Sequence, residues 1–336
     1  MREDWIDRWK GLLILLVVLG HTVGGGGNIA EGRTADILLD VRHVIYLFHM
    51  PAFFILAGLC FATPDDGMLK IFIVKRFRRL VIPYFAFGVA SWLIYDMMYG
   101  KWAEFGMQMV RLVVAYDRFR CNSVLWFLPT MFIVILLAVA SIRLLRNRKL
   151  IALVMAMDFL LFFWLRYNHI KFLPFMMFKV LEYYFYFMVG FETRKFRGTA
   201  IPDACLLWVF AGFVAYAAFC HLTACNTRPF AGYAFWMLKG LVGAILTAAL
   251  AKTLPNRGFR WLEWIGGMSM GIMLVHKFPL VAVQEHIPGV RAMFGNDMSF
   301  AWLGVASVFI ITVAVSIATT LLLRKVAPWA IGERKH

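Results

Sequence analysis

Long apolar runs alternate with short charged connections along the whole chain. Ten of these runs approach the roughly 20 apolar residues that a helix needs to cross a bilayer core of about 30 Å. The runs cover residues 11–27, 44–62, 80–99, 123–142, 150–166, 172–191, 204–222, 231–251, 264–283 and 300–323. The pattern therefore predicts an all-α fold, a polytopic integral-membrane helical bundle of about ten transmembrane helices.

The composition supports a membrane protein. Hydrophobic residues make up 62% of the 336 residues and charged residues only 16%, against about 45–50% and 25% in soluble domains. This excludes a water-soluble enzyme and a nucleic-acid-binding protein. The longest predicted outer connection, 100–122, mixes apolar, aromatic and basic residues as an interfacial helix does. We expect one membrane-embedded domain over residues 1–336, without an appended soluble domain.

The basic residues indicate the topology. The net charge is +16, and Lys and Arg cluster in the short connections. With the N-terminus inside, 22 of them fall on the inner side of the predicted helices and 11 on the outer side. Because cytoplasmic loops carry an excess of Lys and Arg, we expect both termini in the cytoplasm and a multi-pass protein of a bacterial-type plasma (inner) membrane.

Metal and disulfide chemistry are not indicated. The eight His form no HExxH or HxxxH set, and the five Cys form no CxxC pair. We therefore expect no metal.

Polar residues within membrane helices are costly and mark functional sites. Lys10 and His21 are eleven residues apart in the first predicted helix, so they share one face and are about 16 Å apart along the axis. His49 lies at a depth similar to that of His21, near the outer end of the second helix. A snorkelling Lys and His side chains bonded to neighbouring helices are the structural alternatives.

Two further groups are candidates for binding. Arg76 and Arg79, at i and i+3, share a face if their segment is helical, and guanidinium groups suit phosphate; a topogenic cluster is the alternative. Asn122 and Trp126 begin the fourth helix at the outer interface, where an amide and a ring could hold a sugar. His276 ends the ninth helix on the same side.

Four charged residues are predicted deep inside helices. Lys179 and Glu182, at i and i+3, could neutralise each other, although Glu182 is also a candidate for substrate binding. The partners and roles of Asp158 and Lys239 are not indicated by the sequence.

Five segments together resemble acyltransferase family 3 of integral-membrane O-acyltransferases, in particular its fucose 4-O-acetylase-like branch. In the order of the family, they are DRWKGLLILLVVLGH, FHMPAFFILAG, RFRRLVIPY, NSVLWFL and GMSMGIMLVHKFPL. The resemblance covers nearly the whole chain and is strongest over the first 85 residues.

The resemblance implies roles for individual residues. In the family, a basic residue and a His separated by ten positions form a signature with a catalytic His, and Lys10 and His21 occupy these places. The family more often has Arg at the first place, so a point-charge role fits Lys10 better than a bidentate one. The RxxR pair of the family, associated with acyl-CoA, matches Arg76 and Arg79. Members with a fused periplasmic domain are longer, so this chain would complete the transfer alone or pass the group to a partner.

These residues together predict an acyltransferase. Lys10, Arg76 and Arg79 would bind acetyl-CoA, the acyl donor, at the inner mouth. His21, further outward, would act as general base or transient acyl acceptor, and His49 would orient it or stabilise the oxyanion. The acceptor would be the hydroxyl of a cell-surface or lipid-linked glycan.

Two other functions are compatible with a bundle of this kind. A proton-coupled transporter or flippase of a glycan precursor would use the charged residues inside the helices, but no mirrored pair of broken helices is evident. A scaffold whose basic loops bind anionic membrane lipids would leave the intramembrane His residues unexplained. The oligomeric state, including a homodimer, is left open.

Overall fold

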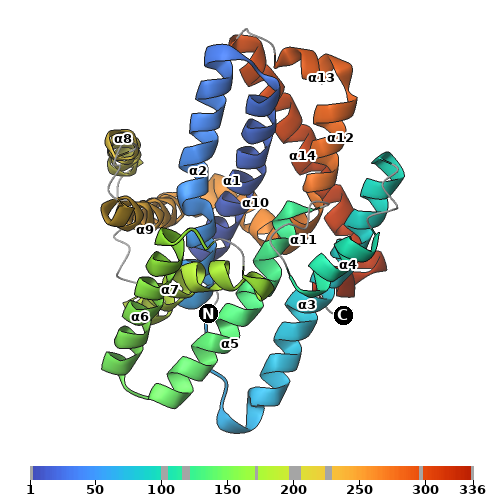
Figure 1. Cartoon of the computed structure of the whole chain (residues 1–336). Helices are drawn as coiled ribbons and strands as arrows, with labels where there is room; N and C mark the ends of the chain where they lie inside the picture. The colour runs from blue at the N-terminus through green and yellow to red at the C-terminus, as the bar shows by residue number, and fades with distance from the viewer. Residues whose placement is uncertain are drawn as a thin grey trace. The chain divides into compact units, whose positions relative to one another are not determined.

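The computed structural model describes residues 3–99, 105–115, 122–170, 173–196, 206–223, 229–294 and 298–333. These residues form helices and contain no strand, which confirms the all-α prediction (Figure 1). The longer helices are α1 (Asp4–Ile29), α2 (Gly32–Leu59), α3 (Leu69–Tyr99), α5 (Phe127–Leu145), α6 (Arg148–Tyr167), α7 (Met177–Thr193), α8 (Leu206–Leu222), α9 (Pro229–Thr253) and α14 (Met298–Val326). The shorter ones are α4 (Phe105–Val113), α10 (Asn256–Gly267), α11 (Ser269–Val275), α12 (Lys277–His286) and α13 (Pro288–Met293).

The lengths of these helices confirm a multi-pass membrane protein. Among the described residues, seven helices are long and apolar enough to span a membrane: α1, α2, α3, α5, α6, α9 and α14. The helices α7 and α8, at predicted spans 172–191 and 204–222, have 17 residues each, about 26 Å at 1.5 Å per residue. Residues 204 and 205 of that second span lie outside the described residues. The count of ten and the cytoplasmic location of both termini stay predictions.

The ninth predicted span, 264–283, is not one straight helix. It contains a bend of 58° between Arg257–Gly267 and Ser269–His286, so the pair forms a broken span or a re-entrant loop. The break lies at Met268, directly after Gly266 and Gly267. Adjacent glycines weaken a helix, and this local signal accounts for the break that hydropathy alone does not reveal.

Other boundaries differ because helices extend beyond their apolar cores. The first helix begins at Asp4 rather than at residue 11, and the second begins at Gly32 rather than at residue 44. The helix α4 occupies part of the predicted interfacial segment 100–122, of which residues 100–104 and 116–121 lie outside the described residues. The earlier start of α2 adds about three turns, which include Arg42.

The structure divides into two compact units. Unit 1 comprises Met1–Phe53 and Phe196–Leu322, and unit 2 comprises Phe54–Lys195 and Leu323–His336. The division falls within α2 and near the end of α14.

In unit 1, α1 is the central element. It packs against α9, α10, α11 and α12, and the chain turns back after it, so that α2 follows as the second arm of a helical hairpin (Figure 1). The contact with α10 is close, because a Cβ on Gly11 would overlap the backbone oxygen of Leu262, and one on Gly266 that of Asp7. Small residues of this kind allow membrane helices to approach closely.

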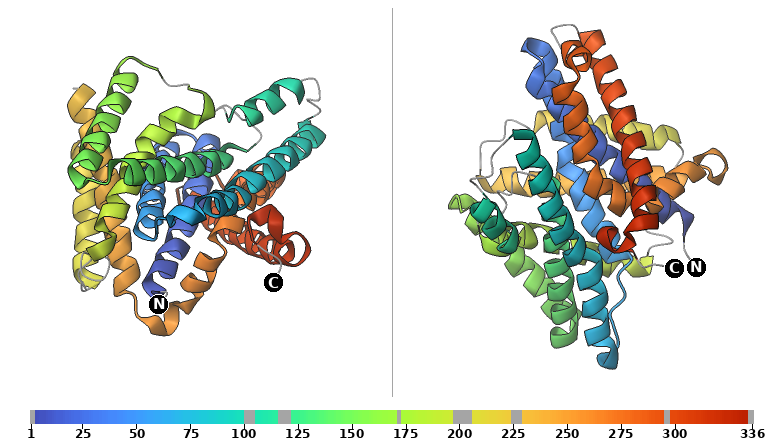
Figure 2. Two further views of the ribbon diagram at one scale, coloured as in Figure 1. Left: turned by 90° about the horizontal axis from the view of Figure 1, so that it is seen from below. Right: turned by 90° about the vertical axis from the view of Figure 1, so that its right-hand side faces the viewer.

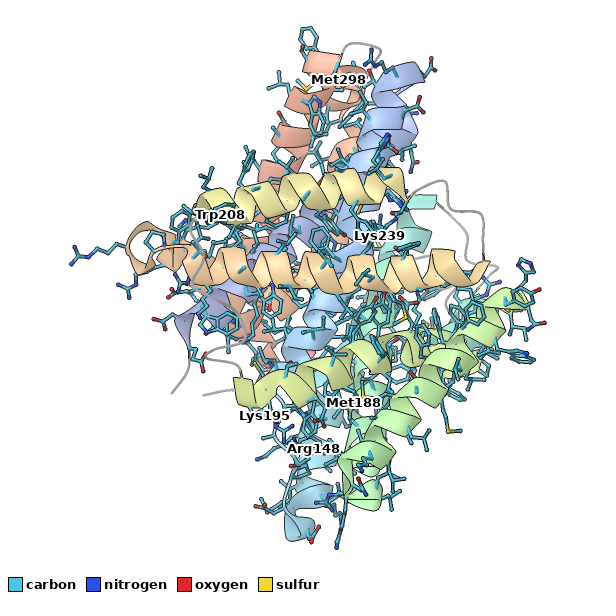
Figure 3. The ribbon with its side chains drawn as sticks, turned by 90° about the vertical axis from the view of Figure 1, so that its left-hand side faces the viewer. Arg148, Met188, Lys195, Trp208, Lys239 and Met298 are labelled. Carbon is cyan, nitrogen blue, oxygen red and sulfur yellow. The ribbon has the colours of Figure 1, made fainter. Side chains whose placement is uncertain are left out.

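The remaining helices of unit 1 surround this hairpin. The long helix α14 (Figure 2) passes the end of α13, where Gly304 faces Met293 and Phe294. The helices α8 and α9, which carry Trp208 and Lys239, lie side by side (Figure 3). The hydroxyl of Tyr216 on α8 donates a hydrogen bond of 3.2 Å to the backbone oxygen of Lys239.

Unit 2 is built around α5 and α7. The helix α5 packs against α3, α6 and α7, and α6 packs against α7, as Figure 3 shows for the segments that carry Arg148 and Met188. The end of α2 approaches α7 closely, because a Cβ on Gly58 would overlap the backbone oxygen of Phe187. Gly58 therefore lets α2 pack closely against α7.

Candidate active site

A pocket of about 520 Å³ opens in unit 1 beside the C-terminal half of α1. Its walls come from α1, α2, α12 and α13. The polar and charged residues in these walls are His21, Asn28, Arg42, Tyr46, Lys277, Gln284, Glu285, His286 and Arg291. A concave site with several converging polar groups is the usual place for substrate binding.

His21 and Tyr46 form a hydrogen-bonded pair in the wall of this pocket. The Tyr46 hydroxyl lies 2.9 Å from His21 Nδ1, and the two rings meet edge to face with centroids 5.6 Å apart. The bond is possible because Gly20 leaves no side chain in the way, since a Cβ there would come within 2.8 Å of the Tyr46 ring. A hydrogen bond at Nδ1 fixes the orientation of the imidazole and leaves Nε2 for other partners.

His276 is the second imidazole of the site. Its ring centroid lies 5.3 Å from that of His21, and its side chain is fully buried. Its Nδ1 lies 3.0 Å from the backbone oxygen of Ile272 and 2.9 Å from that of Met273. Carbonyl oxygens only accept hydrogen bonds, so Nδ1 carries a hydrogen and the Nε2 of the neutral ring holds a lone pair. That Nε2 is buried and has no hydrogen-bond partner among the residues that the structure describes.

His49 lies behind Tyr46. Its ring centroid is 4.9 Å from that of Tyr46, and its Nδ1 donates a hydrogen bond of 2.8 Å to the backbone oxygen of Ile45. His49 is buried and is not part of the pocket wall. The structure therefore connects it to His21 through Tyr46.

The four consecutive glycines of α1, Gly24 to Gly27, bring neighbouring helices close to the pocket. A Cβ on Gly24 would come within 2.7 Å of Arg42 Cδ, and one on Gly25 would overlap the amide of Gln284. The guanidinium carbon of Arg42 lies 4.9 Å from the centroid of the Tyr46 ring. The Gln284 side chain donates a hydrogen bond of 2.9 Å to the backbone oxygen of Thr22. The glycine run thus lets α2 and α12 place polar side chains against α1.

Lys10 lies away from this pocket. Its Nζ forms an ion pair of 3.0 Å with Asp7, one turn earlier on α1. The neighbouring Arg8 is more deeply buried and lies 3.6 Å from Glu263, and it donates a hydrogen bond to the backbone oxygen of Leu254. The structure therefore separates Lys10 and His21 as the helix geometry predicts, and it does not bring Lys10 to the pocket wall.

Comparison with known families decides what kind of protein this is. The chain matches the acyltransferase domain model of acyltransferase family 3 over residues 3–321. The chain belongs to acyltransferase family 3. No curated protein and no solved structure matches it.

This membership favours the enzyme over the transporter and the scaffold. The match includes every residue of the pocket wall. The family 3 acyltransferase is thus a multi-pass membrane transferase with a candidate active site in unit 1. Assignment to the fucose 4-O-acetylase-like branch stays a prediction.

Two of the three predicted donor residues of this acyltransferase belong to unit 2. Arg76 and Arg79 both lie in α3, so the i, i+3 spacing places them on one face as expected. The guanidinium carbon of Arg76 lies 5.0 Å from the Phe72 ring centroid. Close to Arg79, the C-terminal segment turns at Gly332, where a Cβ would overlap the Arg79 backbone oxygen.

Three predicted acceptor residues of the family 3 enzyme also belong to unit 2. Asn122 is buried, donates a hydrogen bond of 3.0 Å to Ser91, and accepts one from the backbone of Val124. Trp126 stacks on Tyr183 at 5.2 Å, and Lys179 Nζ lies 4.3 Å from its ring centroid. Glu182 is buried. A role for these residues in substrate binding stays a prediction.

The sequence analysis did not single out four residues of this pocket wall, Tyr46, Arg42, Lys277 and Gln284. A spacing signal was present for two of them, because Arg42, Tyr46 and His49 lie at i, i+4 and i+7 of α2 and therefore share one face. The glycine run of α1 was a second signal, since it marks a surface where other helices approach closely.

Proposed function

We propose that this acyltransferase moves an acetyl group from cytosolic acetyl-CoA to a hydroxyl of a cell-surface or lipid-linked glycan, with His21 as general base. The observation that carries the proposal is the contact of 2.9 Å between His21 Nδ1 and the Tyr46 hydroxyl in the pocket wall. It leaves Nε2 of an oriented imidazole as the group that meets the substrate.

The reaction can be written with this chain's own groups. For Nε2 to act as base, Nδ1 carries the ring hydrogen and donates a hydrogen bond to the Tyr46 oxygen. Nε2 takes the proton of the acceptor hydroxyl, and the acceptor oxygen attacks the thioester carbon. The carbon–sulfur bond breaks, and the imidazolium returns the proton to the CoA thiolate. The products are an O-acetylated glycan and CoA.

Other residues have supporting roles in this proposal. Tyr46 orients His21 and stabilises the imidazolium through its oxygen, and His49 supports the Tyr46 ring from behind. His276 places a buried lone pair near His21. Arg76 and Arg79 in unit 2 are proposed to bind phosphate of acetyl-CoA, and Lys10 in unit 1 is a separate candidate for the same role.

The test of the proposal is transfer by purified protein in lipid nanodiscs, supplied with radiolabelled acetyl-CoA and glycan acceptors. The His21→Ala variant should lose about 10²- to 10⁴-fold in kcat, as expected when a general base is removed. His43→Ala is the matched control, because His43 is exposed on α2 and is not part of the pocket wall. Full activity of a correctly inserted His21→Ala protein would overturn the proposal.

The donor site is tested separately. Reversal of Arg76 and Arg79 to Glu should raise the KM for acetyl-CoA strongly, whereas Arg78→Glu, on another face of α3, should not. An unchanged acetyl-CoA dependence of the double variant would remove both arginines from the donor site without affecting the role of His21.

A further inference from the structure

The pocket beside His21 is rich in cations. Arg42 from α2, Lys277 from α12 and Arg291 from α13 belong to its wall, together with one described carboxylate, Glu285. In the part of the chain that the structure describes, Arg42 and Lys277 form no ion pair within 4 Å, although Glu285 attracts Lys277 from a longer distance. Both side chains are partly buried. Cations held in such a position are stabilised when an anion binds between them.

Arg42 is held in its place by packing. Its side chain lies over the bare backbone of Gly24 and beside the Tyr46 ring. Because Tyr46 also bonds to His21, the guanidinium group is one side chain away from the proposed base. A planar guanidinium is suited to bidentate binding of a carboxylate or phosphate.

The position of the cations distinguishes the two substrates of the reaction. In acetyl-CoA the pantetheine arm separates the phosphates from the thioester, so the phosphates cannot lie next to the base while the thioester reacts there. In an acidic saccharide, a carboxylate or phosphate lies on the reacting sugar itself or on its neighbour. The cations beside His21 therefore match the acceptor better than the donor.

We infer that the acceptor is an anionic saccharide whose carboxylate or phosphate binds Arg42 and Lys277, so that a neighbouring hydroxyl faces His21. This inference rests on the proposed function, because it assumes that the acceptor reacts at His21. Gln284, fixed by its bond to Thr22, supplies an amide oxygen in the same wall for a sugar hydroxyl. The anion is the carboxylate of an acidic sugar or the phosphate of a sugar phosphate or lipid carrier.

The test is a binding experiment that requires no transfer. The full chain in nanodiscs is titrated with glucuronic acid, glucose 1-phosphate and glucose, and binding is followed by intrinsic tryptophan fluorescence. We expect at least one of the two anions to bind and glucose to bind at least tenfold more weakly. The anion that binds identifies the source, carboxylate or phosphate. Arg42→Gln and Lys277→Gln should each weaken the binding of that anion about tenfold, a loss of about 1.4 kcal/mol.

Two controls make the result specific. Arg33→Gln removes a cation from an exposed position on the same helix α2, outside the pocket wall, and should leave binding unchanged. Arg42→Lys keeps the charge and should retain part of the affinity. Thermal unfolding of each variant shows whether it is folded.

Three results would overturn the inference. They are binding of glucose as tight as that of both anions, absence of anion binding up to millimolar concentration, and unchanged anion binding in both Gln variants. Weaker acetyl-CoA binding in the Gln variants, with saccharide binding unaffected, would assign the pocket to the donor instead. If His21→Ala loses transfer but the unmodified chain binds neither anion, this inference fails and the proposed base stands. If His21→Ala keeps full transfer while the unmodified chain binds an anion through Arg42 and Lys277, the proposed base fails, and with it the placement of the acceptor hydroxyl at His21.

Discussion

At the N-terminal end of α1 the cations are paired with carboxylates, whereas the cations near its other end face a pocket. Arg8 lies against Glu263 and bonds to the backbone of Leu254, and Lys10 pairs with Asp7. These opposite charges compensate each other within the protein. In the same region, the backbones of α1 and α10 are in direct contact.

Near its C-terminal end, α1 contacts side chains beside the pocket instead of the backbone of another helix. Gly24 and Gly25 accommodate the ends of two polar side chains, those of Arg42 and Gln284, rather than the backbone of another helix. Lys277 adds a further cation to this wall. Glycine thus has two uses in one helix. Gly11 allows a helix–helix contact between backbones, whereas Gly24 makes space for a side chain of the pocket. Substitutions at the two kinds of position are expected to have different effects.

The largest effect is expected where backbone meets backbone. In Gly11→Ala the new Cβ would overlap the Leu262 backbone oxygen, which cannot move unless α1 and α10 separate. We expect a loss of about 3 kcal/mol in stability, as for an overpacked core, measured by thermal unfolding in detergent. The control is Gly267→Ala, where a Cβ meets no atom within 4 Å; equal melting temperatures of the two variants would contradict the distinction.

The next effect is expected at the bond that orients the proposed base. Tyr46→Phe removes the hydroxyl that lies 2.9 Å from His21 Nδ1. A hydrogen bond to a group that becomes charged contributes about 1.5–3 kcal/mol, so kcat should fall at least tenfold while the KM for acetyl-CoA stays the same.

Tyr84→Phe is the matched control for this variant. It also removes a buried tyrosine hydroxyl, one that donates a hydrogen bond of 2.8 Å to the Leu112 backbone oxygen in unit 2. It should leave kcat unchanged if the folded protein is recovered. A full kcat for Tyr46→Phe would show that His21 needs no orientation by this hydroxyl.

A smaller effect is expected from adding a methyl group at Gly24, next to the Arg42 side chain. In Gly24→Ala the Cβ would approach Arg42 Cδ to 2.7 Å, and a flexible side chain yields more easily than backbone does. We expect a KM for the acceptor raised a few-fold, with a melting temperature close to that of the unmodified chain. Gly27→Ala adds the same atom to the same glycine run next to Leu39, away from Arg42, and its acceptor KM should not change.

The sequence predicted the elements of this fold better than their contacts. Apolar runs located the helices, but not their charged ends, because the helix α2 continues through Arg42 and Arg33 beyond its apolar core. His21 and His276 were each identifiable as polar residues within membrane helices. Their proximity was not, since they are 255 positions apart and hydropathy does not specify which helix faces pack together. Tyr46 gave no signal by itself, because tyrosine is common near membrane interfaces.

The smallest effect on stability, and the most informative on the donor, is expected at Lys10. Its pair with Asp7 joins two residues of one helix, and the Lys10 side chain is 33% exposed, so Lys10→Gln should lower the free energy of unfolding by less than about 1 kcal/mol.

If Lys10 binds a phosphate of acetyl-CoA, the pair with Asp7 competes with the donor. Lys10→Gln should then raise the KM for acetyl-CoA a few-fold, and Asp7→Asn should lower it, because it releases the ammonium group for the donor. Opposite changes of the KM for acetyl-CoA in the two variants would show that Lys10 binds the donor. An unchanged KM in both variants would show that groups other than Lys10 bind it.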